Sequence, residues 1–169
     1  GLSWGVTTGC NAEVDDTPES ASAGSASQVA GASSGGSAGS SSALPELHSY
    51  AADDPKLQYM GRIHWADPKA PRFAAGAVQL KAKFVGTGAT VKILDENRYG
   101  NNKNYFEVLV DDAPAVKLTA LKTQTDYVVA QDLANGEHTL TVAKRTEAGI
   151  GFSRFLGLDV LGELAEPPA

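Results

Sequence analysis

Cysteine is almost absent: the chain of 169 residues has one, Cys10, which excludes an internal disulfide and a zinc site made of cysteines. No apolar run approaches the roughly 18 residues that a membrane-spanning helix requires. Basic residues number 14 against 20 acidic ones, and the net charge of −6 argues against a nucleic-acid-binding protein, which needs clustered positive charge. The three histidines, at positions 48, 64 and 138, lack the spacing of metal ligands. We therefore expect a soluble, mildly acidic domain without a metal or cofactor.

Lysine and arginine are missing from the first 43 residues, and the end of this stretch has low complexity. Within residues 17–43, Ser, Ala and Gly make up 22 of the 27 residues. Such a composition buries too little apolar surface to offset the entropy lost on ordering. We predict a flexible linker over residues 17–43, with a root-mean-square span of roughly 30 Å.

Residues 1–16 form a separate leader segment in which Cys10 follows Thr8 and Gly9. A lone cysteine after small residues and before a long polar linker resembles the lipobox of bacterial lipoproteins, where the cysteine carries the lipid. Thr7 departs from this pattern, because leucine is usual at that position. The alternative is a cysteine without a role in a leader remnant. In either case we expect a domain that is secreted or at the bacterial cell surface, with membrane contact only through a lipid on Cys10.

Apolar and polar residues alternate over much of residues 44–169, which is typical of β-strands. Strands are expected at residues 57–65, 78–85, 90–95, 105–111, 115–118, 126–130, 138–143 and 152–161. Asn135-Gly136 has turn composition, and Gly86-Thr87-Gly88 is expected to turn the chain. No segment carries an apolar stripe of helical period. These features predict an all-β fold over residues 44–169, an antiparallel β-sandwich or jelly roll of about eight strands with its own core.

Serine and histidine are not arranged for nucleophilic catalysis in the expected β domain. A serine hydrolase needs a nucleophile on a sharp turn, a histidine base and an oxyanion hole, but Gly-x-Ser-x-Gly is absent and the domain contains only Ser49 and Ser153. His48 precedes Ser49 directly, and neighbouring side chains of an extended chain point to opposite faces. His138 follows a turn and is expected at the surface. We predict that the chain contains no catalytic residue and is not an enzyme on its own.

Charged residues interrupt the alternation at residues 62–65 and 144–147. Such clusters are either solvated strand ends or contacts with another domain or a ligand. Exposed aromatic rings stack on sugars, although such rings more often anchor a loop or the core. Paired carboxylates at 95–96 and 111–112 lie at strand ends, where turn chemistry explains them. The candidate carbohydrate or domain contacts are Arg62, Trp65, Tyr99, Tyr105, Arg145 and Glu147.

Five segments, in this order and spacing, resemble the N-terminal jelly-roll domain of carbohydrate esterase family 2. The resemblance covers residues 57–168, and its most specific parts are Gly-x-His-Thr, at 136–139, and Lys-Arg-Thr-Glu-Ala, at 144–148. His64 is a departure, because an acidic residue is expected after Gly-Arg-Ile. The segments are residues 59–63, 84–88, 105–112, 133–140 and 144–148.

The resemblance implies that the chain is an accessory domain of a secreted esterase. In that family the β domain precedes an SGNH-type α/β hydrolase domain, which contains the catalytic Ser and His and removes acetyl groups from plant polysaccharides such as xylan or mannan. The β domain would pack against the hydrolase domain and shape its substrate cleft. We expect Arg145 and Glu147 in that contact as paired charges, because an unpaired buried charge costs several kcal/mol. The alternatives are a stand-alone carbohydrate-binding module and a surface lipoprotein domain without a role in sugar binding.

Overall fold

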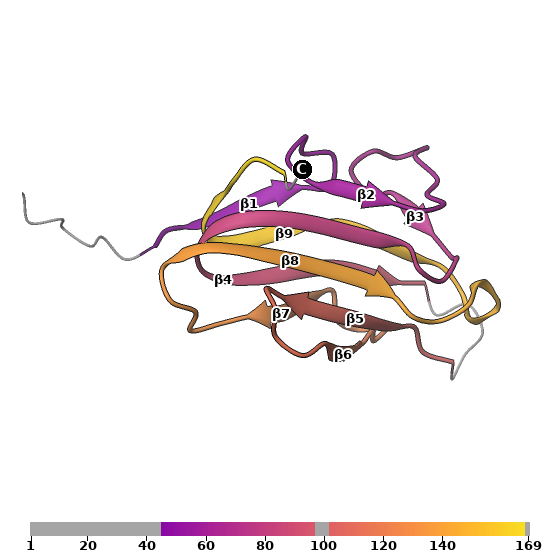
Figure 1. Cartoon of the computed structure of the whole chain (residues 1–169). Coiled ribbons are helices and arrows are strands. Elements are labelled where there is room, and N and C mark those ends of the chain that lie inside the picture. The colour runs from indigo at the N-terminus through magenta and orange to yellow at the C-terminus, as the bar shows by residue number, and fades with distance from the viewer. Residues whose placement is uncertain (1–44, 97–101, 168–169) are drawn as a thin grey trace, which may run out of the picture. The chain divides into compact units, whose positions relative to one another are not determined.

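The computed structural model describes residues 45–96 and 102–167 (Figure 1). The chain divides into two units, residues 1–40 and 41–169, and the described residues all belong to the second. They form nine strands, all paired antiparallel, and one short 3₁₀ helix, η1 (Ala148–Ile150). The strands are β1 (Leu47–Ala51), β2 (Gln58–Met60), β3 (Arg72–Phe73), β4 (Gln79–Asp95), β5 (Tyr105–Val110), β6 (Val116–Thr119), β7 (Asp126–Ala130), β8 (Gly136–Lys144) and β9 (Ser153–Leu164). Within these ranges no helix has the length and apolar character needed to span a membrane.

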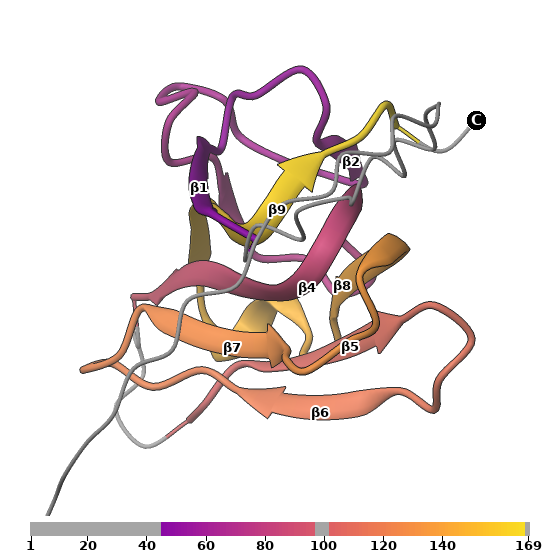
Figure 2. The same cartoon turned by 90° about the vertical axis from the view of Figure 1, so that its left-hand side faces the viewer.

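Two layers of strands pack face to face and share β4 and β9 (Figures 1 and 2). The first half of β4 pairs with β2 and β8, and β8 continues the layer to β5 and β6. The second half of β4 pairs with β9 and β7, while β9 also pairs with β1 and β3. Strands that pass from one sheet to the other form the corners of such sandwiches. The all-β sandwich expected from the sequence is confirmed.

The strand β4 changes the face that it buries near its middle. From Leu80 to Gly88 the even-numbered residues are buried, whereas from Ala89 to Asp95 the odd-numbered ones are. The pairing register of β4 shifts in the same region, which is the mark of a β-bulge. The turn expected at Gly86-Thr87-Gly88 is therefore wrong, because the chain continues as a strand and bends into the second layer.

Two paired glycines make this corner possible. Gly86 pairs with Gly162 of β9, so both strands bend at the same place. A Cβ atom on Gly86 would lie 2.0 Å from the carbonyl oxygen of Leu161, and one on Gly162 would lie 2.0 Å from that of Val85. Gly162 also has a φ of +132°, which L-residues rarely adopt. Only glycine fits at these two positions.

The core lies between the two layers. Phe84, Phe106 and Leu140 enter it from the first layer, and Val91 and Leu158 enter from the second; each is at most 1% exposed. Burying a side chain of this size contributes roughly 1.5–3 kcal/mol relative to leaving it in water.

Candidate functional site

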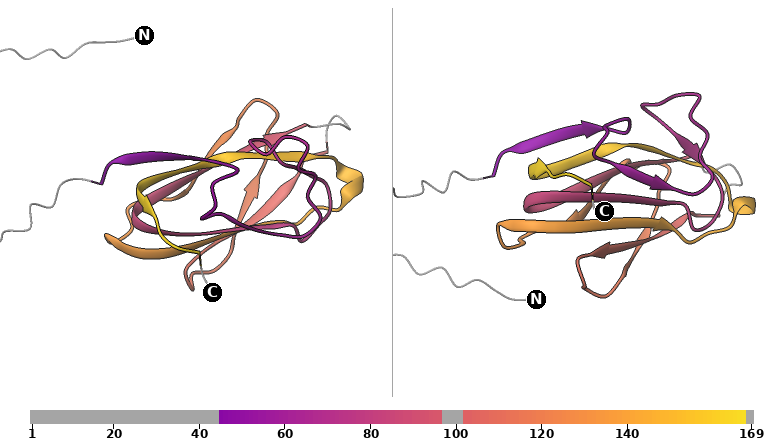
Figure 3. Two further views of the ribbon diagram at one scale, coloured as in Figure 1. Left: turned by 90° about the horizontal axis from the view of Figure 1, so that it is seen from above. Right: turned by 45° about the horizontal axis from the view of Figure 1, so that its top comes forward.

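The loops at one end of the sandwich bring several of the candidate residues together. Tyr105 begins β5 and Lys144 ends β8, and because these strands are antiparallel the two ends meet: the Arg145 N–H donates to the Tyr105 carbonyl oxygen at 2.8 Å. The 3₁₀ helix η1 and the loops around β2 and β3 lie at the same end (Figure 3). We call it the loop end; it comprises residues 60–78, 95–96, 102–105 and 144–153.

Five of the six candidates lie at the loop end: Arg62, Trp65, Tyr105, Arg145 and Glu147. Trp65 is 44% exposed and packs edge-on against Tyr59, with ring centroids 4.9 Å apart. The sixth candidate, Tyr99, and the lipidation candidate Cys10 lie outside the described residues.

Lys144 is buried and holds the loop that follows it. Its amine donates to the carbonyl oxygen of Thr146 at 2.8 Å and to the hydroxyl of Thr146 at 2.9 Å. Burial lowers the pKa of Lys144 to about 8, against the opposing effect of the Asp95 charge. The motif Lys-Arg-Thr-Glu-Ala thus begins with a lysine that closes a tight loop.

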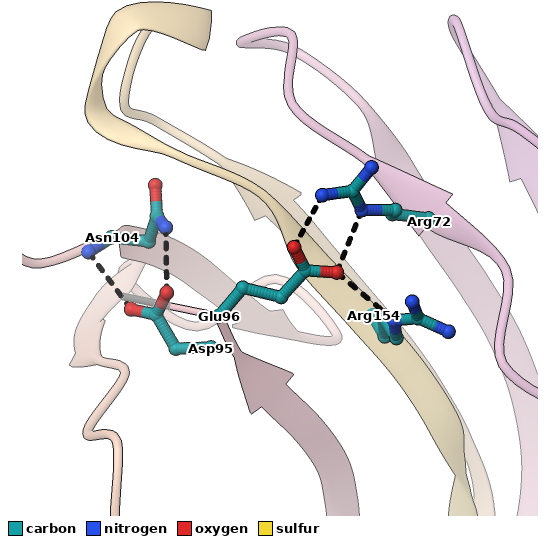
Figure 4. A network of polar contacts seen from close by, with 5 residues as sticks. All are labelled: Arg72, Asp95, Glu96, Asn104 and Arg154. Carbon is teal, nitrogen blue, oxygen red and sulfur yellow. Dashed lines mark hydrogen bonds and ion pairs between the residues drawn. The ribbon is translucent and has the colours of Figure 1, made fainter. Parts of the chain in front are cut away.

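A chain of hydrogen bonds continues from this loop into the sandwich. The Thr146 hydroxyl donates to the Asn104 Oδ1 at 2.7 Å. The Asn104 Nδ2 in turn donates to the Asp95 Oδ1 at 3.0 Å (Figure 4). Asn104 and Asp95 are 1% and 3% exposed. Since a buried polar network is stable only when its groups are bonded, these contacts fix the 144–147 loop to the ends of β4 and β5.

The side chains between these anchors point to solvent. Arg145 and Glu147 are both exposed, and the Arg145 Nη1 lies 3.8 Å from the Glu107 Oε1. An exposed pair at this distance contributes about 1 kcal/mol at most. Glu147 has no ion pair to a described residue and Arg145 has only this exposed one, so both side chains are accessible to charges on another molecule or domain.

A groove of about 510 Å³ lies beside this loop. Its walls carry three residues with basic side chains and six apolar residues, and no described acidic residue lines it. We call it the basic groove. Its lining residues are Arg62, Ile63, His64, Arg72, Phe73, Ala74, Ala75, Ala148 and Phe152.

Arg72, which lines the basic groove, shares the Glu96 carboxylate with Arg154 (Figure 4). The Arg72 Nε donates to the Glu96 Oε1 at 2.6 Å, its Nη2 donates to the Glu96 Oε2, and the Arg154 Nε donates to the Glu96 Oε1 at 3.0 Å. These bonds, first of all those from Arg72, hold the pKa of Glu96 below its ordinary value. Arg72 and Arg154 are direct partners across β3 and β9, and Glu96 offsets the repulsion between them.

No pattern in the sequence predicted this cluster. Arg72 and Arg154 are 24 and 58 residues from Glu96, and none of the three stands in a recognisable motif. Glu96 was expected to serve a turn, whereas it forms ion pairs with both arginines. The only available signal was the position of Glu96 at the end of a strand.

Within the described residues, the imidazoles of His48 and His138 bond to groups other than the hydroxyls of Ser49 and Ser153. Ser49 is exposed on β1, and the Ser153 Oγ is buried without a hydrogen-bond partner. The His48 Nδ1 bonds to the Gly162 carbonyl oxygen at 2.7 Å. His138 bonds to Asp111 through Nδ1 and to the Ala134 carbonyl oxygen through Nε2. In residues 45–96 and 102–167, no group of three or more His, Cys, Asp or Glu side chains could hold a metal ion.

Comparison with known proteins identifies relatives of the β domain. The family profile described as "Carbohydrate esterase 2 N-terminal" matches residues 59–168. Over 107 residues the chain is 34% identical to the cellulase/esterase CelE of Acetivibrio thermocellus, covering 63% of this chain and 12% of CelE. It is 26% identical over 106 residues to an acetylxylan esterase / glucomannan deacetylase of Cellvibrio japonicus, covering 63% of this chain and 28% of that enzyme.

Solved structures show the same fold. A family two carbohydrate esterase from Clostridium thermocellum, an active-site mutant in complex with an oligosaccharide, superposes with a TM-score of 0.61 at 32% identity, covering 69% of this chain and 34% of that one. The family two esterase from Cellvibrio japonicus superposes with a TM-score of 0.66 at 24% identity, covering 73% and 36%. This chain therefore spans about a third of each solved esterase, and less of the curated relatives. By its sequence profile, the chain belongs to the carbohydrate esterase 2 N-terminal family.

Proposed function

We propose that this chain is the non-catalytic N-terminal domain of a secreted bacterial carbohydrate esterase that deacetylates plant polysaccharides such as xylan or mannan. The domain packs against a downstream SGNH hydrolase domain and shapes its substrate cleft. The family membership supports this proposal, as does the description of the two curated relatives as a cellulase/esterase and an acetylxylan esterase / glucomannan deacetylase.

The observation that carries the proposal is the fixed 144–147 loop. Lys144 and Asn104 hold its backbone from inside, while Arg145 and Glu147 remain exposed. A contact surface that is already ordered loses little conformational entropy on docking, so a buried network under exposed charges suits a domain interface. The nucleophile and the base belong, in this proposal, to the hydrolase domain.

The experiment compares the isolated chain with the whole enzyme. The isolated chain releases no acetate from acetylated xylan or from an aryl acetate. In the whole enzyme, Arg145→Glu lowers kcat/KM for acetylated xylan by about tenfold, the effect expected when a paired interface charge is reversed. Lys122→Glu, the same charge change in the turn between β6 and β7, leaves kcat/KM unchanged. Turnover by the isolated chain that Ser49→Ala or His138→Ala abolishes would show that the domain is itself the enzyme.

A stand-alone carbohydrate-binding module is the second candidate, and the exposure of Trp65 favours it. If sugar rings stack on the Trp65 side chain, xylan or mannan in an affinity gel would retard the isolated chain. Trp65→Ala would abolish that retardation. An unchanged migration in both gels would remove this candidate.

We also propose export of the protein, with lipid attachment at Cys10. Metabolic labelling with a radioactive fatty acid tests the attachment, because Cys10→Ser would abolish the label. A surface lipoprotein domain without a role in sugar binding would carry the label and bind neither polysaccharide.

A further inference from the structure

Positive charge gathers at the basic groove although the chain as a whole carries a net charge of −6. Arg62, His64 and Arg72 line it, and Arg154 lies beside Arg72. The Glu96 carboxylate accepts hydrogen bonds from both Arg72 and Arg154. Three guanidinium groups thus stand with one carboxylate, which leaves an excess of positive charge at this place.

These guanidinium groups retain donors for a further anion. A guanidinium has five N–H donors. Bonds to Glu96 engage the Nε and Nη2 of Arg72 and only the Nε of Arg154. Arg72 and Arg154 are 33% and 35% exposed, and Arg62 is exposed without an ion pair to any described residue.

The groove is also rigid and partly apolar. The Arg72 guanidinium lies 3.6 Å from the centre of the Phe152 ring and is also bonded to the Glu96 carboxylate. Because these contacts already hold the Arg72 side chain, it loses little further conformational entropy when a ligand binds. Ile63, Phe73 and Ala148 line the walls. Apolar walls reduce screening by water and strengthen the attraction between a guanidinium and a carboxylate.

We propose that the basic groove binds the carboxylate of a uronic acid side group on the polysaccharide, and so directs the esterase to acidic xylan. This inference rests on the proposed function for the polysaccharide, and on charge complementarity for the carboxylate. A planar carboxylate matches the fork of a guanidinium in two parallel hydrogen bonds. The groove volume of about 510 Å³ suits a sugar unit, since small-molecule pockets range from roughly 300 to 1,000 Å³.

Binding of matched oligosaccharides to the 169-residue chain tests the proposal. The first ligand is a xylo-oligosaccharide with one glucuronic acid branch, and the second is the same compound with the carboxyl group reduced to an alcohol. Isothermal titration should show the acidic ligand bound at least about tenfold more tightly, with an affinity that falls as salt is added. Equal affinities, or no binding of the acidic ligand at millimolar concentration, would overturn the proposal.

Variants identify the groups that bind the carboxylate. Arg62→Gln removes a groove charge that has no ion pair to a described residue, and it should weaken the acidic ligand about tenfold while leaving the reduced ligand unchanged. Lys122→Gln is the matched control outside the groove and should weaken neither. An unchanged affinity of the acidic ligand for Arg62→Gln, or an equal loss for both ligands, would contradict the assignment.

The whole enzyme separates this proposal from the accessory role. Arg62→Gln should lower kcat/KM on glucuronate-substituted acetylated xylan and leave turnover of an aryl acetate unchanged. If it lowered both, the groove would be a contact with the hydrolase domain and the uronate assignment would be wrong. The accessory role is tested separately by Arg145→Glu on unbranched acetylated xylan, so either proposal can fail alone.

Discussion

The His138 imidazole is held by two acceptors at the end of the sandwich opposite the loop end. Its Nδ1 lies 2.7 Å from the Asp111 Oδ2 and its Nε2 lies 2.8 Å from the Ala134 carbonyl oxygen. Since both partners accept, both ring nitrogens donate only when the ring is protonated, so the two contacts favour the imidazolium form. The side chain of His138 is 12% exposed. The sequence predicted a surface histidine, and the structure shows that its ring is held by contacts within the domain.

This pair predicts a stability contribution that depends on pH. The bond to the Ala134 carbonyl and then the bond to Asp111 raise the pKa of His138 above 6.5. Burial raises the pKa of Asp111, but its bonds from His138 and the Thr139 N–H outweigh burial and bring it below 3.8. The histidine contribution is full below pH 6.5 and is lost as pH rises through the folded pKa. The aspartate contribution is full above pH 3.8 and is lost as pH falls through the folded pKa.

Urea unfolding of His138→Gln across pH checks this expectation. The wild-type chain should be more stable than the variant by about 1 kcal/mol near pH 5. The difference should shrink as pH rises through the folded pKa of His138, above 6.5, and as pH falls through the folded pKa of Asp111, below 3.8. His64→Gln, which changes an exposed histidine, should show no such profile. A constant difference between His138→Gln and wild type from acid to alkaline pH would contradict the imidazolium.

Single residues also show what sequence reasoning could and could not locate. The charges that interrupt the alternation at Arg62, Arg145 and Glu147 lie in exposed loops beyond strand ends, and their role as contacts stays a prediction. Lys144 belongs to the same run of charges but is buried. The sequence alone does not indicate that its amine will donate hydrogen bonds to a backbone carbonyl oxygen. The pairing of Arg72 with Glu96 depends on tertiary structure alone.

At the scale of elements, alternation located most of the strands. The strand expected at 126–130 coincides with β7, and the one at 138–143 lies within β8. β1 was missed, because none of its five residues is buried and its sequence does not alternate clearly. β4 was split in two, because a bulge reverses its pattern and its glycines have the composition of a turn.

Alanine at the corner of β4 and β9 should be severely destabilising. Gly162→Ala would place a Cβ 2.0 Å from the Val85 carbonyl oxygen at a φ of +132°, so both strands must shift. We expect a loss of about 3 kcal/mol or more in the free energy of unfolding measured with urea. Gly88→Ala, with its Cβ 3.0 Å from the Ala130 carbonyl oxygen, should cost less.

A surface glycine supplies the control for this series. A Cβ on Gly149 meets no atom within 4 Å, so Gly149→Ala should lie within about 0.5 kcal/mol of wild type. The description of the corner would be wrong if Gly162→Ala were as stable as Gly149→Ala. If Gly162→Ala does not fold at all, the free energies of unfolding of the other two variants still test the corner: Gly88→Ala should be less stable than Gly149→Ala.

For the domain as a whole, the sharing of β4 and β9 means that neither layer is complete alone. The first layer contains one half of β4 and the second layer contains the other, joined by the corner at Gly86 and Gly162. Opening either layer therefore strips partners from both. The loop end draws on both layers too, because β8 leads to Arg145 in one and β9 carries Arg154 in the other. The exposed charges and the basic groove thus keep their spacing only while the whole sandwich is intact.

Native-state hydrogen exchange should reveal this coupling. The amides of Leu80 and Val91 lie in the two halves of β4, each between two neighbouring strands. If the sandwich opens as one unit, both amides exchange only through global unfolding, with opening free energies that agree within about 0.5 kcal/mol and match the value from urea. A destabilising change in one layer, such as Val108→Ala, should then lower both values equally. Exchange of Val91 through a smaller opening, with Leu80 still protected, would mean that the second layer moves independently, and that the two walls of the loop end are not held by one cooperative scaffold.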